Sequence, residues 1–356
     1  MRTHFTLRRL ILATSVSALA AFSSPSLRAD TFTWLGSGTD TNDSWSNPAF
    51  WQGGVAPTGL DATDVLTFIG TSSPKFFSNN TIAASPFLLN QLVLNVTGPA
   101  STFSLINGNS LAFVGTTSQL IQNSSGGIAI NTPLILDGTL TVGGDGQGLA
   151  TANAKISGIA NIVKNGTSTF RFGTTGSGNF LPPSDNTWLG TVQINAGTVR
   201  FNNNAESGRT AVRANPIFMN GVSAVFSCNS EIRVGTVSGD FGDFRTIITT
   251  LEMANPDSES ILITALSDGV YRGALTLMPP IGTGGNKGEL LVRGTGTQTL
   301  AGIINIDEDV IVGRGATLIL AGNASLGNQA QGSIVLNGGT FRLENEDTNK
   351  IGRAHV

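Results

Sequence analysis

Apolar and polar residues alternate along most of the chain in short runs, which end at Gly, Asn or Asp. Alternation with period two predicts β-strands that bury one face and expose the other. Clear cases are residues 92–96, 102–106, 110–114 and 127–130. The two segments closest to helical periodicity, 246–253 and 260–266, are rich in Ile and Thr, which favours strands. We therefore predict an all-β protein with essentially no helix beyond residue 30.

One short unit recurs along the chain. It has two alternating apolar positions, a corner that contains Gly, a Thr or Ser, and two further apolar positions. It occurs at residues 134–142, 192–201, 217–226, 310–320 and 334–343, and its corner contains Asn or Asp in every copy except 310–320, where it is Gly-Arg-Gly. Because Gly adopts positive φ at low cost, the middle of the unit can bend or reverse the chain. A β-hairpin and a corner bent out of plane share this local sequence, so the unit alone leaves the topology open.

The spacing of the units favours a stack of coils. The units at 192 and 217 begin 25 residues apart, and those at 310 and 334 begin 24 residues apart. One coil of a β-solenoid takes roughly 20–30 residues. We predict an elongated parallel β-solenoid in which 192–201 and 217–226 occupy adjacent coils. Inward Leu, Ile, Val and Phe, including Ile194 and Leu336, would form its core, and Asn or Ser would form ladders at the corners.

Residues 30–74 differ from the repeats, because Trp34, Trp45 and Trp51, three of the four tryptophans, fall there. One interpretation is a cap, since an open-ended β stack needs a cover on its first edge. The alternative is a platform of exposed rings that binds carbohydrate, which makes these three residues the candidate ligand surface. We predict a Trp-rich capping region at 30–74 and solenoid repeats at 75–350.

The two ends of the sequence suggest processing and truncation. Arg2, Arg8 and Arg9 precede an apolar run at 10–22, which is too short for a transmembrane helix and typical of a signal peptide. We expect residues 1–29 to be this signal, cleaved after Ala20 or Ala29, and the mature chain to be exported. Residues 351–356 interrupt the repeat pattern, and we expect them to be a non-native tail on a truncated reading frame.

Charge and residue usage restrict the chemistry further. Residues 30–350 contain 15 Lys and Arg against 23 Asp and Glu, which disfavours nucleic acid and anionic membranes as partners. The only histidines, His4 and His355, lie in the expected signal and tail, so no imidazole serves as a base or metal ligand in the mature chain. Cys228 is the single cysteine, which excludes an intrachain disulfide. We expect no cofactor and no metal.

Carboxylates are the remaining candidates for catalysis, as in polysaccharide lyases or hydrolases built on β-helices. Adjacent side chains of a strand alternate faces, so in the acidic run 307–309 only Asp307 and Asp309 could converge. The other acidic groups considered are scattered: Asp240, Asp243, Glu252, Asp257 and Glu259. The segment 143–148 is one imperfect copy of a calcium-binding Gly/Asp repeat that normally occurs in tandem. We assign no catalytic residue and keep a polysaccharide-acting enzyme as the alternative function.

Two consecutive segments carry a family resemblance. Residues 155–172, KISGIANIVKNGTSTFRF, and 186–201, NTWLGTVQINAGTVRF, resemble the autotransporter-associated β-strand repeat of large exported bacterial passenger proteins. Trp188 stands where that repeat usually has Tyr, and Ser168 where it usually has Gly. The resemblance implies a right-handed parallel β-helix without catalytic residues, located outside the cell or on the outer-membrane surface.

The family pattern also implies how such a chain would act. It implies a structural or adhesive role, with weak multivalent contacts to glycans or other cell-surface components. It implies that the mature fragment does not insert into a membrane. A C-terminal anchor or translocating barrel belongs to the full-length proteins of this type, and we expect this chain to be an N-terminal fragment of one.

Overall fold

The computed structural model describes most of the chain between residues 29 and 344. The described residues are 29–36, 42–72, 76–99, 102–115, 117–172, 187–201, 215–228, 232–246, 261–277, 290–306, 309–321, 324–325 and 333–344. Of the expected signal at 1–29, all but residue 29 lies outside this part of the chain, and so does the expected tail at 351–356.

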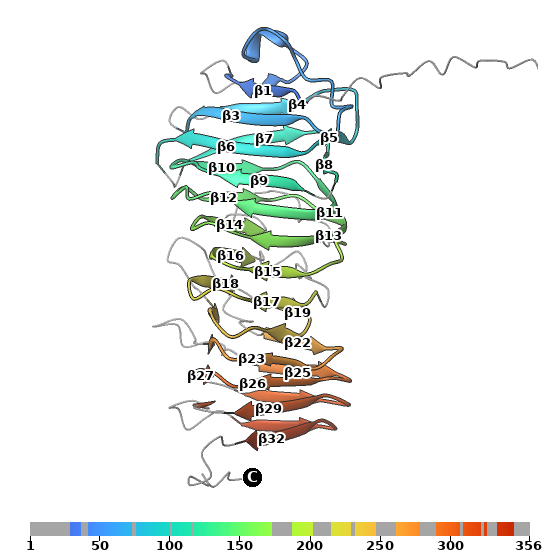
Figure 1. Ribbon diagram of the computed structural model, residues 1–356, viewed down its shortest axis with the longest axis vertical. Helices are drawn as coiled ribbons and strands as arrows, with labels where there is room; N and C mark the ends of the chain where they lie inside the picture. The colour runs from blue at the N-terminus through green and yellow to red at the C-terminus, as the bar shows by residue number, and fades with distance from the viewer. Residues whose placement is uncertain are drawn as a thin grey trace, which may run out of the picture.

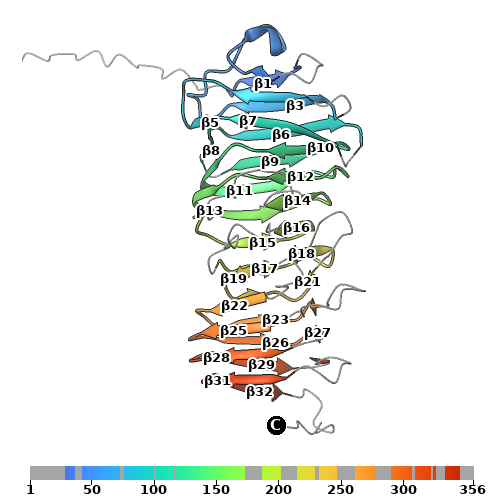
Figure 2. The ribbon, with the colours of Figure 1, turned by 180° about the vertical axis from the view of Figure 1, so that it is seen from behind.

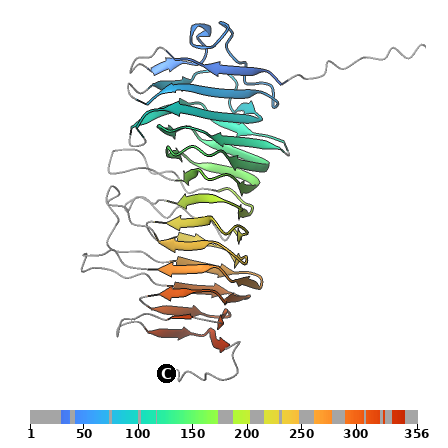
Figure 3. The ribbon, with the colours of Figure 1, turned by 60° about the vertical axis from the view of Figure 1, so that its left-hand side comes forward.

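The described chain is a β-solenoid. Its strands stack along the long axis of an elongated molecule, from the N-terminal end to the C-terminal end (Figure 1; Figure 2). Turning the molecule shows that the strands lie across that axis (Figure 3). Every ladder between named strands is parallel, and one short 3-10 helix, η1 (Pro48–Phe50), lies near the N-terminus. The predicted all-β parallel solenoid is confirmed.

Each coil passes in order through up to three faces, which we number by their order along the coil. The first face holds β5 (Phe87–Leu89), β8 (Leu111–Phe113), β19 (Ile232–Val234), β22 (Ile261–Ala265), β25 (Leu290–Gly294), β28 (Val310–Gly313) and β31 (Ile334–Asn337). Two long strands, β11 (Leu134–Gly143) and β13 (Ile156–Lys164), run from the first face into the second.

The second and third faces carry the remaining strands. The rest of the second face is β1 (Thr31–Trp34), β3 (Val65–Thr71), β6 (Gln91–Thr97), β9 (Ser118–Gln122), β15 (Val192–Ile194), β17 (Ile217–Met219), β20 (Val237–Ser238), β23 (Gly269–Tyr271), β26 (Thr297–Leu300), β29 (Thr317–Ala321) and β32 (Thr340–Glu344). The third face is β2 (Asn42–Ser44), β4 (Phe77–Asn80), β7 (Phe103–Gly108), β10 (Gly127–Ile130), β12 (Ala150–Ala152), β14 (Thr169–Phe172), β16 (Gly197–Phe201), β18 (Ala224–Cys228), β21 (Asp243–Thr246), β24 (Ala274–Leu277), β27 (Ile304–Ile306) and β30 (Ala324–Ser325).

The recurring sequence unit is a corner between two faces. β15 and β16, the two strands of the unit at 192–201, belong to different sheets, and each pairs in parallel with its equivalent in the next coil, β17 and β18. Residues 192–201 and 217–226 therefore occupy adjacent coils, as predicted. At this corner Gly197 has a φ of +69°, and a Cβ there would lie 2.4 Å from the carbonyl oxygen of Gly166 in the preceding coil. Coil stacking thus leaves room for glycine alone.

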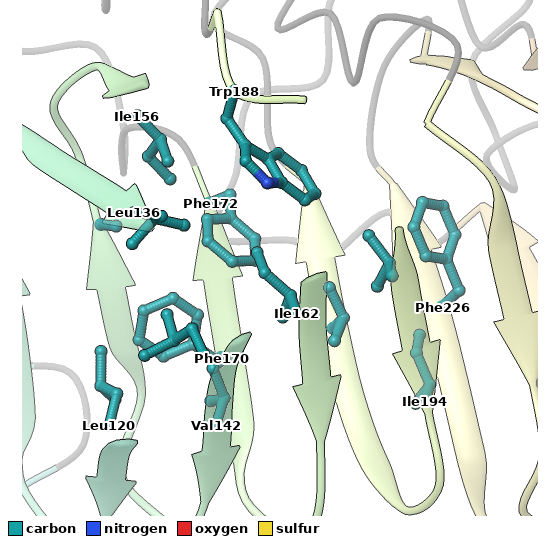
Figure 4. Packing of buried hydrophobic residues seen from close by; sticks show 14 of the residues in the cluster. Leu120, Leu136, Val142, Ile156, Ile162, Phe170, Phe172, Trp188, Ile194 and Phe226 are labelled. Atoms are coloured by element: carbon teal, nitrogen blue, oxygen red, sulfur yellow. The ribbon is translucent and has the colours of Figure 1, made fainter. Parts of the chain in front are cut away.

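One inward column shows how the core is built. Through successive pairings of second-face strands it runs Leu92, Leu120, Val142, Lys164, Ile194 and Met219. Apolar members of this and the neighbouring columns fill the space between the faces (Figure 4). Ile194 is fully buried, which confirms the prediction for that residue. Trp188 is also buried, and its Nε1 donates to the carbonyl oxygen of Ala160 at 2.7 Å.

The prediction for Leu336 is wrong. This side chain is 54% exposed, although its strand β31 continues the column of Val312, which is buried. A β-solenoid buries an inward side chain from both sides along the axis, and no described coil follows β31 and β32. Leu336 therefore has a covering neighbour on one side only.

Amide ladders stabilise the corners, as the sequence predicted. The Nδ2 of Asn131 donates to the Oδ1 of Asn107 at 2.9 Å, and the Nδ2 of Asn153 donates to the Oδ1 of Asn131 at 2.9 Å. A second ladder joins Asn195 to Asn165 at 2.8 Å. Each carboxamide is both donor and acceptor, so a column of identical side chains satisfies itself along the axis.

Candidate functional site

The three predicted ligand-surface tryptophans lie close together in the interior. Trp34 and Trp45 are 0% exposed and Trp51 is 2% exposed. Their rings pack edge to face, with centroids 5.0 Å apart for Trp34 and Trp51 and 5.8 Å apart for Trp45 and Trp51. Phe68 of β3 lies against all three. The expectation of an exposed ring platform is wrong, because the faces that would stack on a sugar are covered by protein.

These tryptophans instead close the first edge of the stack. Residues 50–52 run antiparallel beside β1, with a bridge between Trp34 and Trp51. The backbone N–H of Leu35 donates to the carbonyl oxygen of Phe50 at 2.9 Å, and the backbone N–H of Gln52 donates to the carbonyl oxygen of Thr33 at 2.9 Å. The edge strand therefore has partners on both sides, which blocks further strand addition there. β1 and β2 already pair in parallel with β3 and β4, so cap and repeats share the same ladders.

The candidate carboxylates are dispersed over the solenoid. Asp307 and its neighbour Glu308 lie outside the described residues, as do Glu252, Asp257, Glu259 and the side chain of Asp243. Asp240 forms an exposed ion pair with Arg272, at 2.9 Å. Asp309 accepts hydrogen bonds at its Oδ1 from the amide of Ser333 at 2.7 Å and from its hydroxyl at 2.8 Å. Asp240 and Asp309 therefore contact partners in neighbouring coils rather than each other.

The contact of Asp309 belongs to a recurring arrangement, which we call the inter-coil clamp. In each clamp, one side-chain oxygen of Asp or Asn accepts the backbone N–H of a Ser or Thr in the next coil, in most cases together with its hydroxyl. The pairs and N–H distances are Asp145 to Thr167, 2.8 Å; Asn161 to Thr191, 3.1 Å; Asp268 to Thr297, 2.8 Å; and Asp309 to Ser333, 2.7 Å. The hydrogen bonds from Thr167 hold the pKa of Asp145 below its ordinary value.

Lys164 is a buried cation that sequence analysis did not single out. Its side chain points inward between Val142 and Ile194 of the same column and is fully buried. The Nζ donates to the carbonyl oxygens of Asn165 at 2.7 Å and Gly166 at 2.9 Å. Burial lowers the pKa of Lys164 to about 8, with a smaller opposing effect from Asp145. The ammonium therefore caps the carbonyl groups of the corner.

Asp64 is the second perturbed group, beside the cap. Its side chain is buried, and burial raises its pKa to about 6, with smaller contributions from the negative charges of Asp61 and Asp30. Among the residues that the structure describes, no group of three His, Cys, Asp or Glu side chains is arranged to hold a metal ion. The negative charges of Asp61 and Asp30 instead repel the carboxylate of Asp64, and protonation of Asp64 relieves that repulsion.

Two of these features carry a recognisable sequence signal. Lys164 is two residues beyond Ile162 in an alternating strand, so period two places it inward. The clamps pair an Asp or Asn with a Ser or Thr one coil later, which could be found once the coil length is known.

No family model, no curated protein and no solved structure matches this chain. In the described part of the chain, no helix combines the length and apolar character that crossing a membrane requires. The fold and the contacts within it are therefore the basis for a functional proposal.

Proposed function

We propose that this chain is a non-enzymatic, exported β-solenoid of the passenger type, with a structural or adhesive role at the cell surface or outside the cell. The observation that carries the proposal is the inter-coil clamp. Asp145, Asp268 and Asp309, side chains that could otherwise act as acids or bases, hold one coil to the next. Contacts between neighbouring coils stabilise a long stack, and a long stack presents an extended binding surface.

Further support comes from the interior. One hydrophobic cluster extends from the tryptophan cap to β29. The ammonium of Lys164 is paired with corner carbonyls, and the side chains of Asn107 and Asn131 are paired with each other. A continuous core of this kind makes a rod whose long lateral surface offers repeated weak contacts, and repeated contacts gain strength through effective concentration. The partners we propose are glycans or other surface components.

Catalysis is tested by incubating the purified chain with a panel of acidic and neutral polysaccharides. We expect weak binding at most and no change in chain length by size-exclusion chromatography or reducing-end assay. The informative variant is Asp309→Asn, with Asp268→Asn as the matched control, because both carboxylates form clamps. Reproducible cleavage that is lost in Asp309→Asn and kept in Asp268→Asn would replace the proposal with a carbohydrate-active enzyme.

Export is tested with an epitope inserted after Gly54, where the backbone is exposed and an added Cβ meets no atom within 4 Å. We expect antibody to label intact cells or the culture medium. Labelling only after lysis, with the inserted chain folded, would contradict the proposed location.

A further inference from the structure

The outward side of the second face carries no charged side chain where β3, β6, β9, β11, β13, β15 and β17 form it. These strands follow one another along the axis (Figure 1). Their outward side chains alternate with the buried ones. One outward column runs through successive ladders as Gln91, Gln119, Thr141, Val163, Gln193 and Phe218. We call this surface the uncharged face.

The side chains of the uncharged face are ordered but incompletely covered. The Nε2 of Gln91 donates to the Oε1 of Gln119 at 2.9 Å, which fixes the spacing between these two coils. Phe218, at the end of the column, is 36% exposed. Parallel sheets are normally covered on both sides. Here the core covers one side, and the other side is available for a partner.

An apolar ridge borders the uncharged face. Ile159 and Leu189 lie in a parallel bridge and are 71% and 52% exposed. The backbone N–H of Leu189 donates to the carbonyl oxygen of Gly158 at 3.0 Å, and the backbone N–H of Ala160 donates to the carbonyl oxygen of Leu189 at 2.9 Å. Ile159 is four residues before Val163 in β13, so both side chains leave the strand on its outward side. The ridge is therefore preorganised by the ladder beneath it.

The absence of charge on this face contrasts with the rest of the chain. Residues 30–350 contain 23 Asp and Glu against 15 Lys and Arg. Beside the uncharged face, Asp137 lies at the corner before Thr141, and Asp145 lies beyond the end of β11. Acidic surfaces repel one another, and the core of a protein interface is depleted of charged residues. Two copies of this acidic chain can therefore meet along the uncharged face without that repulsion.

From this geometry we propose that the uncharged face and its ridge form the interface of a dimer, and that the partner is the same face of a second copy of this chain. A parallel sheet presents rows of side chains about 4.8 Å apart, and a second copy presents rows with the same spacing. The rows of one copy can then interdigitate with those of the other, as in packed sheets. A neutral polysaccharide offers hydroxyl groups to the same carboxamides, but its spacing is not set by β-strands.

The proposed contact is closed. Because each copy uses the same patch, the interface is self-complementary, and assembly stops at two chains. This inference is independent of the proposed surface role and of its glycan partners.

Sedimentation equilibrium of the purified full chain at increasing protein concentration tests the proposal. We expect the mass to rise from that of one chain to that of two and to stop there. Because no charged group lies in the contact, added salt should not weaken the dimer. A mass of one chain at every concentration, growth beyond two chains, or dissociation by salt would overturn the proposal.

Ile159→Lys and Thr141→Lys test the surface. Each adds a positive charge to both sides of the contact and should raise the dissociation constant of the dimer about 10- to 100-fold. Both side chains point outward, so the far-UV circular dichroism spectrum should be unchanged. The matched control is Ile303→Lys, because Ile303 is 69% exposed but lies before β27, away from the uncharged face. All these proteins share the apolar run at 10–22, so any association through it cancels in the comparison.

The variants separate the proposal from its alternatives. Loss of the dimer in Ile159→Lys and Thr141→Lys, with its retention in Ile303→Lys, would support the proposal. Equal weakening by all three substitutions, or a dimer that both Ile159→Lys and Thr141→Lys retain, would place the contact elsewhere and overturn it. A monomer that co-sediments with an insoluble neutral polysaccharide, and no longer does so in Thr141→Lys, would assign the face to a glycan instead.

Discussion

The buried ammonium of Lys164 should make the stability of the rod increase with pH. Burial lowers the pKa of this group from 10.5 to about 8 in the folded chain. Between these two values the unfolded chain binds more protons than the folded chain does, so the free energy of unfolding rises as the pH rises. The cost of the buried charge is present in full below about pH 8 and is relieved as Lys164 loses its proton in the folded state.

The size of the effect follows from the shift. Each pKa unit corresponds to about 1.4 kcal/mol. Part of the gain falls above pH 10, where the unfolded lysine still loses its proton, so we expect a gain of about 2 kcal/mol between pH 7 and 10. Lys164→Met should abolish that gain. At pH 7 its own stability should differ little, since it removes a buried charge but leaves the carbonyls of Asn165 and Gly166 without a donor.

The assay is urea unfolding followed by circular dichroism at pH 7, 8, 9 and 10. Wild type is compared with Lys164→Met and with Lys155→Met, a partly exposed lysine in the strand-to-corner segment before β13. Groups that titrate in both proteins cancel in the comparison. A pH-dependent gain that persists in Lys164→Met, or that disappears equally in Lys155→Met, would refute the assignment of the effect to the buried ammonium.

Three further predictions concern single positions. Ile194→Asp should lower the free energy of unfolding by several kcal/mol, because it buries an unpaired carboxylate. The control Gln193→Asp, on the outward side of the same strand, should be tolerated. The melting temperatures of the two variants are compared, and equal values would contradict inward packing of Ile194. Burial raises the pKa of Asp64 to about 6, so the free energy of unfolding of the cap should fall by about 1 kcal/mol as the pH rises from 4 to 7. Asp64→Asn should flatten this pH dependence of stability, measured by tryptophan fluorescence. An unchanged dependence in the variant would contradict the assignment to Asp64. Gly197→Ala should cost more than Gly54→Ala, since both have a φ near +70° but only the first meets a carbonyl oxygen at 2.4 Å; similar unfolding midpoints would show that the corner can relax.

The sequence by itself determined the strand content, the coil spacing and the inward side of most strands. These properties are local, because the alternation of residues along one strand determines which side chains share a face and does not depend on the neighbouring coil. The adjacency of 192–201 and 217–226 followed from one spacing that matched one coil. The Asn ladders followed from repeated corners, since a repeated residue lies above its own copy.

Only the tertiary structure decided what each side chain contacts along the axis. The partner in the next coil depends on coil length, and the clamped pairs Asp145–Thr167 and Asn161–Thr191 are 22 and 30 residues apart. The sequence likewise shows three tryptophans close together at residues 34–51, but it does not show whether their rings face solvent or pack around Phe68. The hydrogen bond from the Nε2 of Gln298 to the carbonyl oxygen of Val237 spans 61 residues and two coils. Such contacts arise from the register between coils, which a chain with unequal coil lengths does not encode in any local pattern.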